Sequence, residues 1–207
     1  MAFLKFLTLI LCANVIVALA PCPIVSTDHG HILGVTLKSD TNSYHAFKAI
    51  PYAEPPVRGL RFEPPVEVQS NWTAVLNATT EVPPKCLQWS IMDTGDPIQG
   101  TEDCLYLNVF TPKLPHQNSM QLLPVMVFIH GGGFMSGSAD FYGERKIMET
   151  GKMLLVTLNY RLGVLGFLST EDDVIAGNMA RYTVASHKNC RRWCFYSRRI
   201  SAKRATR

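Results

Sequence analysis

The stretch Val125–Phe134 constrains the fold of this chain more than any other part of its sequence. Five apolar residues follow Pro124 and run directly into His130 and three consecutive glycines. An unbroken apolar run of this length predicts a strand that is buried on both faces of a parallel sheet. Glycines, which lack Cβ atoms, then let backbone N–H groups approach a ligand closely. Such amides suit an oxyanion, although an ordinary glycine turn after a buried strand also accounts for these residues.

The sequence around this strand predicts a strand–helix–strand unit. Tyr142–Thr150 can form a short helix that ends at Gly151, and Met153–Tyr160 is expected to form another buried strand. This order is typical of a βαβ unit and predicts a parallel sheet. Other expected extended segments are Ile32–Leu37 with a bulge or turn at Gly34, the proline-containing path Ala46–Pro56, and the buried strand Leu105–Phe110.

The composition is that of a globular domain with an unevenly placed charge. The chain has 207 residues, of which 47% are hydrophobic and 17% charged, and its formal net charge is +4. Residues 180–207 contain nine of the 20 Lys and Arg residues and no Asp or Glu, which leaves residues 1–179 with a net charge of −5. The basic average therefore belongs to the C-terminal tail, and the body is acidic.

The first 20 residues have the pattern of a secretory signal peptide. Lys5 precedes the apolar segment Phe6–Val17, and Ala18-Leu19-Ala20 fits a small-residue cleavage site. The apolar segment is shorter than the roughly 20 residues that cross a bilayer, so we expect removal of residues 1–20 and secretion, with no membrane span in the mature chain.

A secretory route gives meaning to two sequons and a pair of cysteines. Asn71 and Asn77 each begin an N-x-T acceptor in a polar stretch, which predicts N-glycosylation at both. Cys86 and Cys104 could close an 18-residue loop in an oxidising compartment, or they could remain two free buried thiols.

The segment Glu102–Pro112, with the sequence EDCLYLNVFTP, resembles the second signature pattern of the type-B carboxylesterases through its whole length. That family includes the cholinesterases and the insect secreted esterases. Further segments resemble the family in the family's order: Phe47–Pro56, Asn159–Gly163, Gly166–Leu168 and Gly177–Asn178. The resemblance implies that residues 21–179 form the N-terminal portion of an α/β-hydrolase fold, a mostly parallel central sheet with flanking helices, truncated before the nucleophile elbow.

The resemblance also assigns roles to individual residues. His-Gly-Gly-Gly after a strand is the oxyanion-loop motif of lipases and esterases, so Gly132 and Gly133 would offer backbone N–H groups to a tetrahedral intermediate. His130 would be structural and hydrogen-bonded to backbone, not the catalytic base. The family pattern pairs Cys86 with Cys104 in a disulfide. Arg61 and Glu102 stand where the family places a buried ion pair, although two solvated surface charges remain an alternative.

The function implied by the resemblance is that of a secreted carboxylic ester hydrolase which forms an acyl-serine intermediate and needs no metal or organic cofactor. Its substrate would be a small-molecule ester, with no nucleic-acid partner. The 207 residues contain no G-x-S-x-G, so we expect no nucleophile, acid or base of a triad here and no activity from this chain alone. The alternative is a non-catalytic, esterase-like adhesion or binding module. The sequence gives neither the particular ester nor the oligomeric state.

Residues 180–207 do not resemble the family. They contain no acidic residue, no glycine and no apolar period, so we expect a tail that is disordered or translated out of frame. A nucleic-acid patch is disfavoured by the secreted context. His187, Cys190 and Cys194 do not have a recognised zinc spacing and lack a fourth ligand.

Overall fold

The computed structural model describes residues 22–69, 72–80, 82–90, 97–114, 123–172 and 174–185. Residues 1–20, which the sequence predicts to be a signal peptide, Asn71 and most of the tail lie outside the described residues, so the expectations for them stay predictions. The described strands are β1 (Ile24–Thr27), β2 (Gly30–Leu33), β3 (Val35–Lys38), β4 (Ser43–Pro51), β5 (Leu76–Asn77), β6 (Gln88–Trp89), β7 (Ile98–Gln99), β8 (Tyr106–Thr111), β9 (Val125–Ile129) and β10 (Leu154–Leu158). The described helices are the 3-10 turn η1 (Arg58–Leu60), α1 (Arg145–Glu149), α2 (Gly163–Phe167) and α3 (Met179–Ala185).

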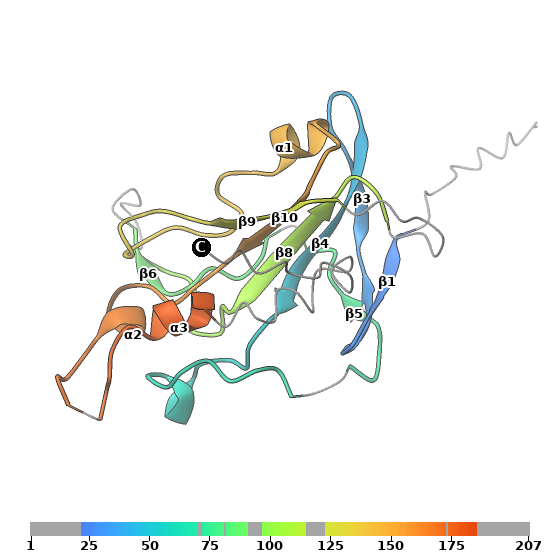
Figure 1. Ribbon diagram of the computed structural model, residues 1–207. Helices are drawn as coiled ribbons and strands as arrows, with labels where there is room; N and C mark the ends of the chain where they lie inside the picture. The colour runs from blue at the N-terminus through green and yellow to red at the C-terminus, as the bar shows by residue number, and fades with distance from the viewer. Residues whose placement is uncertain are drawn as a thin grey trace, which may run out of the picture.

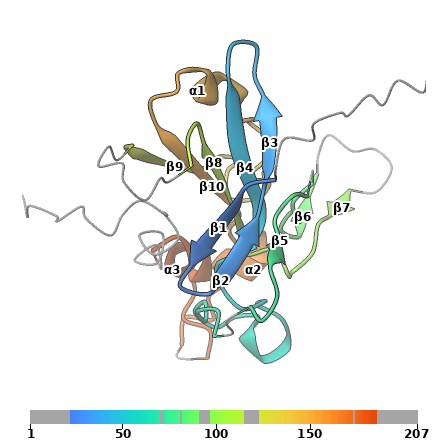
Figure 2. The ribbon, with the colours of Figure 1, turned by 90° about the vertical axis from the view of Figure 1, so that its right-hand side faces the viewer.

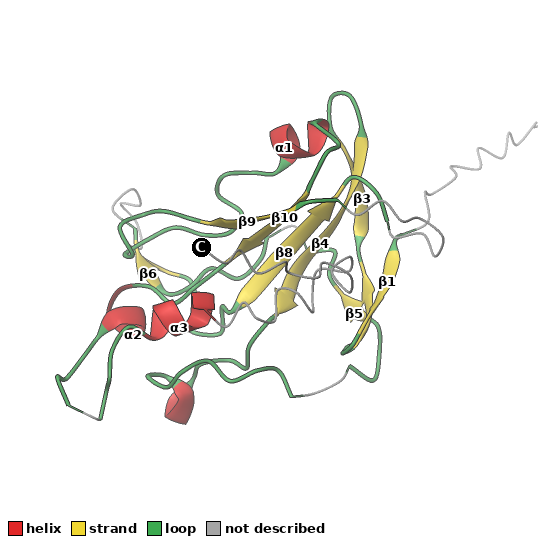
Figure 3. Cartoon of the chain, in the orientation of Figure 1, coloured by secondary structure: helices red, strands yellow, loops and turns green. Residues whose placement is uncertain are grey.

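A five-stranded sheet with the order β3-β4-β8-β10-β9 forms the centre of the molecule (Figure 1). A smaller sheet, β1-β2-β5, lies beside β3 and β4 (Figure 2), and β6 pairs with β7. Helices contribute little, and long loops join the strands (Figure 3). The architecture is a mixed, sheet-rich α/β domain.

The predicted βαβ unit is present. β9 and β10 pair in parallel from Val125 opposite Leu154 to Ile129 opposite Leu158, and α1 lies in the connection between them. The helix is shorter than predicted, because it begins only at Arg145, after Gly143 with a φ of +69°; it ends before Gly151, whose φ is +61°.

The expectation of a mostly parallel sheet is wrong for the described residues. The pairs β3–β4, β4–β8 and β8–β10 are all antiparallel, and β9–β10 is the parallel pair. A parallel pair requires a crossover connection of a dozen or more residues, usually helical, whereas β3 and β4 are joined by a short hairpin. β9 is also less buried than predicted: Val127 is 39% exposed and Ile129 is 46% exposed, because β9 is the terminal strand of this sheet.

Gly34 divides the first predicted strand into two. β2 ends at Leu33 in the small sheet, and β3 begins at Val35 in the large sheet. A Cβ at Gly34 would lie 2.6 Å from the ring of Phe47 and 2.7 Å from the carbonyl oxygen of Ala46. Glycine therefore lets the chain change sheets while it passes directly over β4.

Two apolar layers cover the two faces of the large sheet. One contains Leu107, Val156 and Leu158 and packs against Phe167 of α2 and Ala180 of α3. The other contains Phe110 and Leu155 and packs against Met148 of α1, Met126 and Phe128. α1 and the α2–α3 pair therefore cover opposite faces, an arrangement visible in Figure 1.

Helix α3 crosses the boundary that the sequence placed after Met179. Ala180 is buried against the sheet, and helix α3 continues to Ala185. Residues 186–207 lie outside the described residues, and they include His187, Cys190 and Cys194, the candidates for metal binding in the sequence. Within the described ranges no helix is long and apolar enough to cross a membrane.

Candidate functional site

The glycine loop, residues 130–137, follows the carboxyl end of β9 and extends toward β6 (Figure 1). Gly132 has a φ of +113° and Gly133 a φ of +60°, values that L-residues rarely adopt. A Cβ at Gly132 would lie 1.9 Å from the carbonyl oxygen of Ser136, whereas a Cβ at Gly133 would meet no atom within 4 Å. The backbone is thus closely packed on the inner side of Gly132 and open in front of Gly133.

The N–H groups of Gly132 and Gly133 are available to a ligand. Both residues are exposed, and neither N–H donates to an acceptor within the part of the chain that the structure describes. The carbonyl of Gly132 accepts from the N–H groups of Met135 and Ser136, each at 3.1 Å, which closes the turn. Successive N–H groups without acceptors, on a glycine turn, are the kind of donor that can bind an anion.

Several contacts from outside the turn hold the glycine loop in place. The Phe134 carbonyl accepts from the N–H of Gly163 at 2.8 Å, and the two rings of Phe134 and Phe167 lie 5.0 Å apart. Phe134 itself has a φ of +63°, an unfavourable conformation for a non-glycine residue that persists only where neighbouring contacts impose it. The loop is therefore fixed before any ligand arrives.

His130 is buried beneath the glycine loop, and its predicted structural role is supported by its contacts. Its Nδ1 lies 2.9 Å from the Gly131 carbonyl oxygen, its ring stacks on Tyr160 with centroids 4.4 Å apart, and its own carbonyl accepts from the Tyr160 hydroxyl at 2.9 Å. Burial lowers the pKa of His130, against smaller opposing effects of the Gly131 carbonyl and Asp140. His130 is therefore held neutral as a support for the loop.

Two polar side chains that the sequence did not single out hold the end of the glycine loop. Gln88 bonds both the N–H and the carbonyl of Gly137, at 2.7 and 2.9 Å. Asn159, at the end of β10, accepts from the Ala139 N–H at 2.8 Å and donates to the Pro84 carbonyl at 2.5 Å. These partners are separated by 20 to 75 positions, so no local pattern reveals them; Asn159 was visible only as part of a segment that resembles the family.

The predicted disulfide and ion pair both form. Cys86 and Cys104 are joined, and both are buried. Arg61 binds both carboxylate oxygens of Glu102, at 2.6 and 2.8 Å, and this partner raises the pKa of Arg61. The pair is not buried as the family pattern implied, because the two side chains are 44% and 23% exposed. An exposed pair contributes little to stability.

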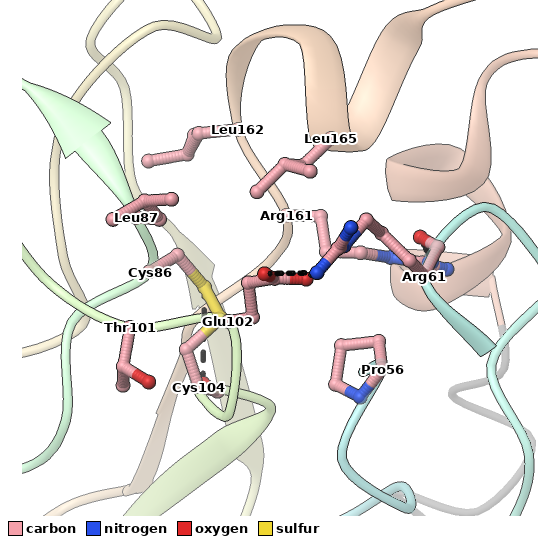
Figure 4. A pocket seen from close by; sticks show the side chains of 10 residues that line it. All are labelled: Pro56, Arg61, Cys86, Leu87, Thr101, Glu102, Cys104, Arg161, Leu162 and Leu165. Carbon is pink, nitrogen blue, oxygen red and sulfur yellow. Dashed lines mark hydrogen bonds and ion pairs between the residues drawn. A yellow bond between two sulfur atoms is a disulfide. The ribbon is translucent and has the colours of Figure 1, made fainter. Parts of the chain in front are cut away.

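A small pocket lies between the disulfide and this ion pair (Figure 4). Arg161 enters from the end of β10 and donates to the carbonyls of Arg61 and Met179, at 3.0 and 3.3 Å. The pocket has a volume of about 10 Å³, which is room for one water molecule and not for an ester. It therefore belongs to the support of the domain rather than to a substrate site.

Two further predictions concern glycosylation and metal binding. Asn77 is exposed at the end of β5, where its Oδ1 accepts from the N–H and hydroxyl of Thr79, so the second sequon is accessible. Across the described ranges no group of His, Cys, Asp or Glu residues could hold a metal ion.

The mixed α/β sheet and the βαβ unit whose first strand leads into the glycine loop are consistent with a partial α/β-hydrolase domain. The profile of the carboxylesterase family matches residues 21–184. The chain belongs to the carboxylesterase family, and this membership implies small-molecule esters as substrates of the family.

Named relatives agree with this assignment. The chain is 46% identical to the juvenile hormone esterase of Tribolium castaneum over 159 residues, 75% of this chain and 26% of the relative. It is 43% identical to the pyrethroid hydrolase Ces2a of Mus musculus over 167 residues, 75% of this chain and 29% of the relative. It is 42% identical to esterase-5C of Drosophila miranda over 155 residues, which are 74% of this chain and 27% of the relative. The chain thus spans a quarter to a third of these relatives, and their names do not favour a non-catalytic binding module.

Proposed function

We infer that this chain provides the strand and oxyanion loop of a secreted carboxylic ester hydrolase that acts through an acyl-serine intermediate. The observation that supports this function best is the pair of exposed N–H groups at Gly132 and Gly133, without acceptors among the described residues, on a loop held by contacts from three other segments. Donors fixed in advance are the arrangement that stabilises charge in a transition state.

The role of the glycine loop follows from the chemistry of ester cleavage. When a serine oxygen attacks the ester carbonyl, the carbonyl oxygen acquires negative charge, and this oxygen would lie in the open space before Gly133. The two N–H groups bind that oxygen more strongly as the charge grows. Removing one such donor typically lowers kcat by a factor of roughly 10²–10³.

The loop is only part of the machinery. The 207 residues contain no G-x-S-x-G, so the serine, its histidine and the orienting acid must come from outside this sequence. Taken by itself, the chain would not turn over esters, because an oxyanion donor without a nucleophile has no intermediate to stabilise. Secretion and glycosylation at Asn71 and Asn77 belong to the same proposal and rest on the sequence patterns.

A chimera tests the proposal. Residues 22–179 are joined to the portion of the Tribolium relative that follows its matched segment, and hydrolysis of p-nitrophenyl acetate is measured. We expect hydrolysis by the chimera and none above background by the 207-residue chain. Gly133→Ala in the chimera would place a methyl group before the N–H groups and lower kcat by roughly 10² or more.

Gly143→Ala is the matched control. Gly143 has a φ of +69° and open space around its Cβ position, as Gly133 does, but it lies outside the glycine loop. The Gly143→Ala substitution imposes the same backbone strain but leaves the glycine loop unaltered. We therefore expect kcat to be nearly unchanged. An active chimera in which both substitutions have equal effects would disprove the role assigned to the loop.

A further inference from the structure

The side chain of Gln88 is fully engaged by backbone groups. Its Nε2 donates to the carbonyls of Cys86 and Gly137, both at 2.9 Å, and its Oε1 accepts from the Gly137 N–H at 2.7 Å. The reverse amide orientation would place oxygen against two carbonyl oxygens and nitrogen against an N–H, so the contacts themselves determine the orientation. One side chain thus joins the residue that begins the disulfide loop to the residue that ends the glycine loop.

Gly137, the last residue of the glycine loop, packs against the residues at the start of the loop. Its φ is +123°, and a Cβ there would lie 2.5 Å from His130 Nδ1 and 2.7 Å from the Gly131 carbonyl oxygen. The backbone of Gly137 is therefore packed directly against the start of the loop. A displacement of Gly137 would release Gly131 and change the direction of the neighbouring Gly132 and Gly133 N–H groups.

The position of Gln88 is in turn set by the disulfide. Gln88 lies two residues after Cys86. Cys86 forms the disulfide with Cys104, and its backbone forms an isolated β-bridge with Thr101. Gln88 also pairs with Gln99 between β6 and β7. Cys104 leads directly into β8 of the central sheet, so the disulfide connects the segment that carries Gln88 to the rigid part of the domain.

We propose that Gln88 is a positioning residue that couples the Cys86–Cys104 disulfide to the geometry of the glycine loop. The inference rests on the proposed function, since the geometry it maintains is that of the Gly132 and Gly133 donors. The disulfide then does more than stabilise the domain: through Gln88 it keeps the loop in the shape that faces an oxyanion.

Residue-resolved hydrogen exchange on the full chain tests the coupling. The N–H groups of Met135 and Ser136 report the shape of the turn, because both bind the Gly132 carbonyl and neither touches Gln88. The Ala139 N–H, bound by Asn159, serves as an internal reference. In Gln88→Ala we expect exchange at Met135 and Ser136 to accelerate roughly tenfold while Ala139 is unchanged. Acceleration at Gly137 alone would overturn the proposal, because it would reduce Gln88 to a local crosslink.

Gln88→Glu adds a readout that a general structural role would not produce. An ionised carboxylate can still accept from the Gly137 N–H, but it faces the Cys86 and Gly137 carbonyl oxygens without a donor. Protonation restores one O–H donor. Protection at Met135 and Ser136, corrected for intrinsic exchange, should therefore return as the pH falls. Gln69→Glu, the same change at an exposed position, is the control and should show no such return.

Removal of the disulfide completes the test. Cys86→Ser with Cys104→Ser should accelerate exchange at Met135 and Ser136 as Gln88→Ala does, and combining the changes should add little, because both act through one connection. Fully additive effects would contradict the coupling.

The chimera described above separates this inference from the proposed function. There, Gln88→Ala should lower kcat roughly tenfold with KM little changed, since the loop acts on the transition state. A chimera without activity, combined with the expected exchange pattern, would reject the function and leave the coupling intact. An active chimera in which kcat does not respond to Gln88→Ala would reject the positioning role.

Discussion

At the scale of single residues, the glycine loop combines positions of very different tolerance. Gly132 is enclosed and Gly133 is open, although both have left-handed backbone and both stand in the same run of three glycines. The motif in the sequence marks the run, but only the three-dimensional surroundings tell the two residues apart. His130 differs again, because its environment, and not its place in the motif, keeps it neutral.

Alanine at the two glycines should therefore have unequal effects on stability. Gly132→Ala forces a Cβ against the Ser136 carbonyl and should lower the free energy of unfolding by about 3 kcal/mol or more, from overpacking and backbone strain together. Gly133→Ala carries only the strain, about 1–2 kcal/mol. Urea denaturation of both variants measures the difference. Equal losses would show that the loop relaxes around either methyl group.

Burial of His130 should make the domain sensitive to acid. Its folded pKa is lowered from 6.5, so the unfolded chain binds a proton at a higher pH than the native chain does. The free energy of unfolding should be constant above about pH 7.5 and decrease as the pH falls through 6.5 toward the lowered pKa.

Substitution of the histidines identifies the source of this slope. His45 is also shifted downward by burial, so His130→Gln and His45→Gln should each remove part of the slope, and the double variant should remove most of it. The free energy of unfolding of each variant, measured between pH 5 and 8, tests this expectation. An unchanged slope in the double variant would exclude both residues as its origin.

At the scale of elements, β9 differs from its parallel neighbour β10. Every residue of β10 is buried, whereas β9 is the terminal strand and exposes Val127 and Ile129. The sequence predicted a buried strand for both segments, and the strand order of the sheet distinguishes them. A strand edge without charge or proline is a site for pairing with another strand.

A lysine in β9 should therefore improve solubility. Val127→Lys places a charge on the exposed edge strand, and we expect at least a twofold higher soluble fraction and a smaller aggregate peak in size-exclusion chromatography. Val82→Lys is the control, because Val82 is 70% exposed but lies outside any strand. Equal improvement in both variants would indicate an effect of net charge alone.

At the scale of the whole molecule, the sequence predicted much of the fold but few of the contacts that hold the glycine loop in place. Apolar segments and turn residues identified the β9–α1–β10 unit and the strand at Leu105–Phe110 because those signals are local. The resemblance supplied the disulfide and the pairing of Arg61 with Glu102, but not the exposure of that pair. The direction of β8 and the edge position of β9 depend on pairing between distant segments, for which a single sequence has no signal.

Asn159 shows the energetic weight of such distant contacts. It is 2% exposed, and its amide joins Pro84 to Ala139. Asn159→Ala would leave the half-buried Pro84 carbonyl and the buried Ala139 N–H without this partner, so we expect the free energy of unfolding to fall by about 2–4 kcal/mol. Asn42→Ala, which removes an exposed side-chain bond to the Glu149 carbonyl, should change it by less than about 1 kcal/mol. Comparable losses in thermal or urea unfolding would contradict the assignment.

The contacts of Asn159 also determine when the glycine loop can take its shape during folding. Pro84 is 75 positions away from Asn159 in the chain, and Tyr52, whose hydroxyl donates to the Asn159 carbonyl, is 107 positions away. A synthetic peptide of residues 125–140 would contain every glycine of the motif and none of these distant partners. The shape of the glycine loop is thus expected late in folding, only after the first half of the domain has met the end of β10.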